Sequence, residues 1–178
     1  MGNPANCTRK MAVKIFDNTG AVVKATQRAM WIALEECGQQ AETEAKRNFT
    51  ASGRSGGTGA LRNSISHRVV DYATCYVGTN LNYAPYHELG TGTYAEGGTG
   101  RKGWWVYVAG SGSTRSRRTG KVYTKQQAMG IAMALRKQGL DARITNGIKP
   151  LHFLRNSVQD HITTYKQIIA KNLKANVK

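Results

Sequence analysis

The residues that could do chemistry are concentrated between Asn82 and Val108, in the stretch NYAPYHELGTGTYAEGGTGRKGWWVYV. His87 and Glu88 are adjacent there, and a histidine beside a carboxylate is what a general base and its orienting group require. Adjacent side chains on a helical turn point in different directions, however, so the two cannot readily form a hydrogen-bonded pair. We therefore expect no catalytic dyad, and we interpret Glu88 as a structural carboxylate that accepts hydrogen bonds from its own loop or from Arg62.

The glycine string from Gly98 to Gly103 (GTGRKG) matches the G-x-G-x-x-G pattern of dinucleotide-binding loops. Such a loop binds a pyrophosphate when it follows a strand and opens a helix, because the helix N-terminus then receives the anion. Here a loop precedes the glycines and a strand is expected to follow them. The neighbouring sequence is also rich in glycine, which makes a chance match easy. The pattern therefore predicts no nucleotide cofactor.

The histidines and cysteines do not form a metal-binding or nucleophilic set. They are scattered over separate segments: Cys7, Cys37, His67, Cys75, His87, His152 and His161. No H-E-x-x-H motif is present, and the odd number of cysteines at unrelated spacings is typical of free thiols in a reducing compartment. We expect no metal, no cofactor and no enzymatic activity.

Positive charge is the strongest compositional signal. The chain has 26 basic and 10 acidic residues, and the segment from residue 101 to 178 holds sixteen of the former and only two of the latter, Asp141 and Asp160. A field of one sign favours a polyanionic neighbour, either nucleic acid or an acidic protein surface, and the alternative is a solvated basic surface. The candidate contact residues lie in or near a predicted exposed basic loop: Arg101, Lys102, Arg115, Arg117, Arg118 and Lys121.

Hydrophobic periodicity predicts an α+β fold in which a small antiparallel sheet packs against a long N-terminal helix and a C-terminal helix. The expected strands lie at 11–17, 64–71, 74–80 and 103–110, with a strand-like link at 141–150. The expected helices lie at 21–48, in a short segment ending at Gly90, at 124–138 with an N-terminal cap, and at 151–173. The inward residues are Met30, Leu34, Cys37, Ala41 and Ala45 in the first helix and Ile131, Ala132 and Leu135 in the capped helix. We expect a flexible arm at 1–10, one domain at 11–178 and an extended Gly-rich and basic loop at 91–125. No apolar run approaches the ~18 residues that a membrane span needs, so no membrane contact is expected.

Four segments, taken in order, carry a resemblance to a known family: EAKRN at a helix end, GALRNSI, VGTNLNYAPYHELGTG and PLHFLRNSV. They resemble the tail-completion proteins of long-tailed bacteriophages, also described as head–tail joining or neck proteins. That family shows T-G-x-L-R-x-S-I, then V-G-[TS]-x-x-x-Y-A-x-[YF]-x-E-x-G-T, then a tryptophan strand and P-x-x-F-L-x-P-[AS]. The matching positions are Thr58, Gly59, Leu61, Arg62, Ser64, Ile65, Gly78, Thr79, Tyr83, Ala84, Tyr86, Glu88, Gly90, Thr91, Pro150, Phe153, Leu154 and Arg155.

The resemblance spans about two-thirds of the chain, from Ala41 to Val158, and it has departures. Asn156 stands where the family usually has proline, and His87 stands where an apolar residue is common. The helix at 124–138 is additional to the shortest members. These departures leave the finer contacts of this chain open.

The resemblance implies a structural virion protein without catalytic activity. Such proteins form a ring, hexameric or alternatively dodecameric, between the portal or adaptor and the tail terminator or tail tube, with DNA in the central channel. The implied contacts with neighbouring subunits fall on aromatic and glycine-rich positions: Tyr83, Tyr86, Glu88, Gly90, Thr91, Trp104 and Trp105. For Tyr83 and Tyr86, packing of a short helix on the sheet is an equal alternative. We also expect the glycines between Gly90 and Gly100 to form a pliable loop that orders only against a neighbour.

A second class of function stays open on the residues alone, namely a free-standing basic protein that binds nucleic acid without sequence preference. The chain lacks zinc-finger spacing, an RNP-like aromatic motif and basic-region heptads, so base readout is not expected. The first function predicts a virion protein assembled in the bacterial cytoplasm. The second predicts salt-dependent DNA binding by a monomer or dimer.

Overall fold

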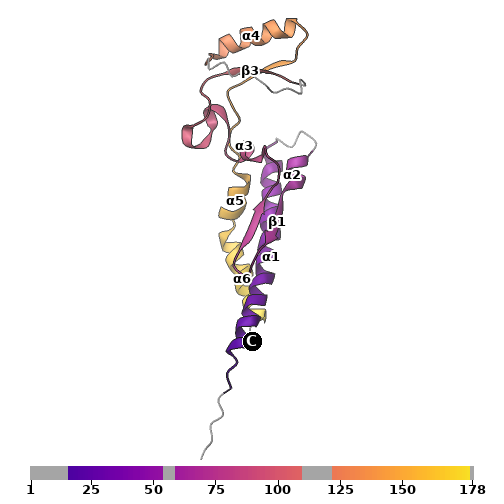
Figure 1. Cartoon of the computed structure of the whole chain (residues 1–178), viewed down its shortest axis with the longest axis vertical. Helices are drawn as coiled ribbons and strands as arrows, with labels where there is room; N and C mark the ends of the chain where they lie inside the picture. Colours follow the sequence, from indigo (N-terminus) through magenta and orange to yellow (C-terminus); the bar gives the residue numbers. More distant parts are fainter. Residues whose placement is uncertain (1–15, 54–58, 110–121, 177–178) are drawn as a thin grey trace, which may run out of the picture.

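The computed structural model describes residues 16–53, 59–109 and 122–176. These residues form an elongated molecule with a helical body and a smaller part at one end, which we call the distal lobe (Figure 1). The body contains α1 (Thr19–Ala51), α2 (Ala60–Ser64), β1 (Ser66–Val69), β2 (Cys75–Gly78), α3 (Ala84–Glu88), α5 (Phe153–Gln159) and α6 (Ile162–Asn176). The distal lobe contains β3 (Trp105–Val108), α4 (Lys125–Lys137) and β4 (Ala142–Thr145), and the 3-10 turns η1 (Gly92–Tyr94) and η2 (Glu96–Gly98) precede it along the chain.

Helix α1 is the longest element of the body, and α5, α6 and the β1–β2 hairpin all pack against it (Figure 1). The helix predicted at 21–48 is confirmed. Its buried row recurs at every fourth residue and consists mostly of small side chains: Ala29, Ala33, Cys37, Ala41, Ala45 and Phe49. Met30 and Leu34 were expected in this row but are only partly buried. Small residues let neighbouring elements approach the helix axis, so close packing rather than large side chains defines this face.

The β1–β2 hairpin packs directly on Gly38 of α1. The strands are antiparallel, with Ser66 opposite Gly78 and Val69 opposite Cys75, as predicted. A Cβ atom at Gly38 would lie 2.5 Å from the His67 ring and 2.7 Å from the Cys75 sulfur. The glycine therefore has a packing role that outweighs its weak helix propensity.

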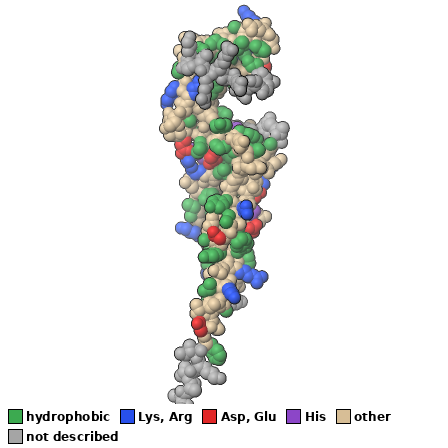
Figure 2. Space-filling view, in the orientation of Figure 1, with side chains coloured by type: hydrophobic (Ala, Val, Ile, Leu, Met, Phe, Trp, Pro, Cys, Tyr) green, Lys and Arg blue, Asp and Glu red, His purple; other side chains and the backbone are tan. Residues whose placement is uncertain are grey.

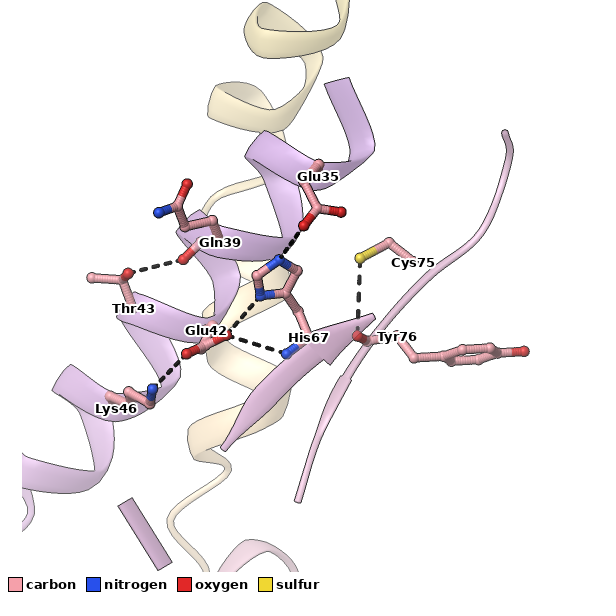
Figure 3. Close-up of polar contacts among 8 residues, drawn as sticks. All are labelled: Glu35, Gln39, Glu42, Thr43, Lys46, His67, Cys75 and Tyr76. Atoms are coloured by element: carbon pink, nitrogen blue, oxygen red, sulfur yellow. Dashed lines mark hydrogen bonds and ion pairs between the residues drawn. The ribbon is translucent and has the colours of Figure 1, made fainter. Parts of the chain in front are cut away.

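The His67 side chain connects this hairpin to α1 through two carboxylates that lie about two helical turns apart (Figure 3). Its Nδ1 lies 2.6 Å from Glu42 Oε2, its Nε2 lies 3.3 Å from Glu35 Oε1, and its backbone N–H donates to Glu42. Lys46 donates to the other oxygen of Glu42. Burial raises the pKa of Glu42, but the hydrogen bonds from Lys46 and His67 outweigh it and hold that pKa below its usual value.

The apolar core lies where α1, α2, α3 and α5 meet. Its buried members are Ala45, Phe49, Leu61, Ile65, Ala84 and Phe153. The Phe49 and Phe153 rings meet edge to face with centroids 5.5 Å apart. Segments that are distant in sequence thus share one core, which makes the body a single packing unit.

Strand β3 does not extend the body sheet. The prediction of a third strand in the same sheet is wrong, because β3 pairs with β4 in a separate two-stranded antiparallel sheet, with Trp105 opposite Thr145 and Val108 opposite Ala142. The segment at 91–125 is accordingly not one loop, since its described residues include η1, η2 and β3. The α+β class, with a small antiparallel sheet packed against the N-terminal and C-terminal helices, is confirmed.

Helix α4 begins as predicted at a capping box. The Thr124 N–H donates to Gln127 Oε1 and the Gln127 N–H donates to Thr124 Oγ1. The buried side differs from the predicted one, because Ala128 and Ala132 are buried, Leu135 is partly buried and Ile131 is exposed. The helix thus rests on the β3–β4 strands through two alanines.

The predicted C-terminal helix is two helices, with the break between Gln159 and Ile162. The Tyr165 hydroxyl donates to the Ser157 carbonyl beside the break, which satisfies a group that a helix end leaves free. None of the described helices is both long and apolar enough to cross a membrane. The arm expected at 1–10 and most of the strand expected at 11–17 lie outside the described residues, and Phe16 and Asp17 are not in a strand.

Candidate interaction site

Glu88 caps helix α5. Its Oε2 accepts from the Leu154 N–H at 3.0 Å and its Oε1 accepts from the Arg155 N–H at 2.9 Å. The His152 N–H also donates to the Glu88 carbonyl. The carboxylate therefore satisfies two of the free amides at a helix N-terminus, where negative charge is favoured. The donors are those of α5, and not the loop or Arg62 as expected.

The residues around Glu88 connect the body to the distal lobe through two adjacent chain segments, which we call the joint (residues 88–93 and 146–155). The Thr91 N–H donates to the Ile148 carbonyl, the Ile148 N–H donates to the Thr91 hydroxyl, and the Thr93 N–H donates to the Asn146 carbonyl, each at 2.9 Å. These bonds hold the two segments side by side. Backbone hydrogen bonds of this kind fix the direction in which the lobe leaves the body.

Glycines of the joint are required by close contact. A Cβ atom would lie 2.7 Å from the Tyr94 carbonyl oxygen at Gly90, 2.3 Å from the Asn146 carbonyl oxygen at Gly92, and 2.0 Å from the Thr91 carbonyl oxygen at Gly147. Real Cβ atoms do not approach backbone oxygens so closely. A Cβ atom at Gly100 would likewise lie 2.0 Å from the Gly92 carbonyl oxygen, so the expectation of a pliable glycine loop is wrong for Gly90, Gly92 and Gly100.

An ion pair fastens the turns that follow. Both guanidinium nitrogens of Arg155 donate to the Glu96 carboxylate, at 2.8 and 2.9 Å. These hydrogen bonds lower the pKa of Glu96 and raise that of Arg155. The turn η2 is thus connected to the first residues of α5, next to the Glu88 cap.

The aromatic residues expected at an interface lie in different parts of the molecule. Tyr83 and Tyr86 belong to the α3 region of the body and keep 41% and 57% of their surface exposed. Trp104 and Trp105 lie in the distal lobe and are partly buried. Both tyrosines remain available to a neighbouring molecule, so the two explanations for them stay equally open.

The tryptophans are each covered by a cation. The Arg101 guanidinium lies 5.1 Å from the Trp105 ring and the Lys125 ammonium lies 5.5 Å from the Trp104 ring. Such contacts hold a basic group over an aromatic face. The pairs fix basic side chains at the base of α4 and beside β3.

The distal lobe carries more basic residues than the six predicted to contact a polyanion. Arg101 and Lys102 are described, whereas Arg115, Arg117, Arg118 and Lys121 lie outside the described residues. Basic residues outside that prediction are Lys125, Arg136, Lys137 and Arg143 in the lobe and Lys149 in the joint. Among described residues 101–109 and 122–149 the acid is Asp141, whose carboxylate pairs with Arg143. That hydrogen bond lowers the pKa of Asp141. The missed residues lie on α4, on β4 and in the joint, and this scattering hid them, although their charge excess was visible in the sequence.

The described residues contain no group of three His, Cys, Asp or Glu side chains able to hold a metal ion.

Burial raises the pKa of the Cys37 and Cys75 thiols, which lowers their thiolate fraction at neutral pH. The chemistry that the arrangement supports is contact: cation-bearing surfaces in the lobe, exposed tyrosines on α3 and a rigid joint between them.

Comparison of the chain with protein-family models, with curated protein sequences and with solved structures gives no significant match.

Removing the Glu88 carboxylate is expected to weaken the joint. Glu88→Ala should lower the free energy of unfolding by about 1.5–3 kcal/mol, because the part-buried Leu154 amide and the exposed Arg155 amide lose a charged acceptor. Glu88→Gln keeps one acceptor oxygen, so it should lose less. Urea unfolding of the three proteins measures both effects, and an Ala variant as stable as the unmodified protein would show that the capping bonds contribute nothing.

Proposed function

We propose that this chain is a structural subunit of a phage neck. In this proposal copies of the chain form a ring that joins the portal or adaptor to the tail terminator or tail tube. The ring surrounds the channel through which DNA passes, and the basic lobe faces DNA or an acidic neighbouring ring. The protein is thus a component of the virion, assembled in the bacterial cytoplasm.

The observation that carries the proposal is the segregation of positive charge onto a projecting part of the molecule. Basic residues dominate described residues 101–149, and their acidic partner Asp141 is already paired with Arg143. The lobe extends beyond the helical body (Figure 1). A projecting lobe of one sign is suited to reach a polyanion while the body packs against its neighbours.

The roles of the resembling residues also support the proposal. Leu61, Ile65 and Phe153 belong to one buried cluster. Glu88 caps the helix that begins at Phe153. Ala45 of the EAKRN segment belongs to the same cluster, so all four resembling segments meet in one structural unit, which gives their combination a physical reason.

The alternative is the free-standing nucleic-acid-binding protein, which the same basic lobe favours. Mass measurement of the purified chain at low and high salt, with and without double-stranded DNA, separates the two. The neck protein should form ring-sized assemblies, or be recruited by purified connector or tail proteins. A monomer or dimer that binds DNA strongly at low salt and ignores those proteins would favour the alternative.

Reversing two charges of the lobe should weaken contact with DNA. The double variant Arg101→Glu and Lys102→Glu should bind double-stranded DNA at least tenfold more weakly at low salt. The slope of log affinity against log salt should fall by about 2, since each phosphate contact contributes about 0.9. The matched control is Lys166→Glu with Lys174→Glu, the same change of charge on exposed positions of α6. Equal losses in both double variants would mean that net charge alone, and not the lobe, determines binding.

A further inference from the structure

Helix α4 presents an apolar face that the described residues leave exposed. Ten consecutive residues, from Gln126 to Leu135, are uncharged, and the residues on the side away from β3 and β4 are exposed. This side, which we call the α4 face, consists of Met129, Gly130, Met133 and Ala134. Met133 keeps 54% of its surface exposed, and space is open around the position that a Cβ of Gly130 would take. Flexible methionines beside a glycine make a face that can enter a groove.

The body carries a groove of matching character between α1 and the turn that joins β1 to β2. This α1 groove is lined by Gln27, Arg28, Trp31, Ile32, Val70, Asp71 and Tyr72, and its lining is mostly apolar. Trp31 and Tyr72 keep 46% and 54% of their surface exposed. Exposed apolar groups gathered in one hollow are typical of protein-binding sites.

One surface is a helix face and the other a groove, and the charges at their edges are opposite. The α4 face is convex and is flanked by Lys125, Arg136 and Lys137, whereas the α1 groove is concave. Asp71 lines the groove, and Glu35, whose side chain is 59% exposed, lies one helical turn beyond Trp31. Arg28 is a basic residue within the lining. The opposite charges therefore meet at the rim of the groove and at the ends of the helix. An amphipathic helix that lies in an apolar groove is a recurring mode of protein recognition.

The α4 face lies in the distal lobe and the α1 groove lies in the body, so the two cannot meet within one chain (Figure 1). Apolar side chains are exposed on both parts (Figure 2). We propose that the α4 face of one copy occupies the α1 groove of a second copy. The contact joins two different surfaces, so each copy keeps one of each for further neighbours, and repetition produces a closed ring or a filament. This inference rests on the ring in the proposed function and names the surfaces that would form it.

A single contact of this kind should be weak. A helix of 13 residues is about 20 Å long, and one of its faces buries less than the roughly 800 Å² per partner of a stable interface. We therefore expect association at high protein concentration, with stability that increases when the ring closes. The charged flanks should make the contact weaker at high salt.

Complementation between two variants tests the contact. Met133→Glu disables the α4 face and Ile32→Glu disables the groove, and both side chains are exposed, so neither variant should unfold at a lower temperature. By sedimentation velocity over a range of concentrations, the unmodified chain should associate beyond a dimer, and each variant alone should associate at least tenfold more weakly. An equimolar mixture should form dimers and nothing larger, because one intact face meets one intact groove.

Cysteine trapping extends the test to contacts too weak for sedimentation. The pair Met133→Cys and Ile32→Cys in one chain should give a ladder of disulfide-linked oligomers under mild oxidation. Chains with either substitution alone, which keep the same native cysteines, should give none. Dimers from Met133→Cys alone would reveal a symmetric contact between α4 helices and overturn the proposal.

The failures are distinguishable. Unmodified chains that associate normally, with both variants unaffected, would overturn this inference and leave the ring of the proposed function standing. Chains that stay monomeric and form no ladder would also overturn it, and the proposed function would then be judged on virions alone. Binding to phosphatidylglycerol vesicles that Met133→Glu abolishes, in chains that do not associate, would identify a membrane contact in place of a second copy.

Discussion

Replacing Phe153 with alanine is expected to lower the free energy of unfolding by about 3–5 kcal/mol. Phe153 is 0% exposed and belongs to the cluster that holds α1, α2, α3 and α5 together. Its ring meets Phe49 edge to face, and alanine would leave a cavity that several helices border. Because small domains are stable by only about 5–15 kcal/mol, much of the stability of the body would be lost.

A matched control lies on the same helix. Val158 is 46% exposed, so Val158→Ala should change the stability by no more than about 0.5 kcal/mol. Urea unfolding followed by circular dichroism measures both variants. Similar losses for Phe153→Ala and Val158→Ala would contradict the assignment of the core to the face that Phe153 occupies.

Replacing Gly92 with alanine should separate close packing from backbone strain at the joint. Gly92 has φ 61° and Gly98 has φ 68°, so alanine is strained by a similar amount at both positions, about 1–2 kcal/mol. A Cβ at Gly92 would also meet the Asn146 carbonyl oxygen and the Trp105 ring, whereas the space at Gly98 is open. Gly92→Ala should therefore cost about 1–3 kcal/mol more than Gly98→Ala.

Hydrogen exchange locates that effect. The Thr91 and Thr93 amides donate across the joint, so they should exchange faster in Gly92→Ala than in Gly98→Ala. Amides in the middle of α1 should exchange alike in both variants. If the two alanine variants were equally stable and exchanged alike, the joint would be a pliable loop, as the sequence first indicated.

Local signals predicted the elements with their own start and stop residues. Thr124 with Gln127 identified the beginning of α4, and the β1–β2 hairpin followed from two short runs of strand-forming residues. The burial of α1 was predicted only in part. Ala29 and Ala33 are buried in place of the larger Met30 and Leu34, because neighbouring elements approach the helix closely. Sequence periodicity shows that a stripe exists but not how near its neighbours come.

Long-range partners could not be predicted from single segments. Strand β3 has the same alternation whether it pairs with β2 or with β4, so its pairing depends on where α3 and the joint direct the chain. The break after Gln159 has no proline or glycine to announce it. The donors to Glu88 lie more than sixty residues away in sequence. A structural role for that carboxylate was foreseeable, but its partners were not.

The glycines of the joint show a further limit. A glycine can provide flexibility or permit close approach of the backbone, and the sequence alone does not distinguish these two roles. Gly90 and Gly92 belong to the second class, while Gly97 and Gly98 have open space around them. The basic residues of the candidate site were foreseen as a charge excess, but Lys125 and Arg143 became visible as members of one lobe only in the folded chain.

The most direct test of the central proposal is electron microscopy of phage lysates in which this chain is not produced. The proposed function predicts DNA-filled heads and complete tails that remain separate, with joining restored when the chain is supplied from a plasmid. Infectious particles with heads and tails properly joined in the absence of the chain would contradict it.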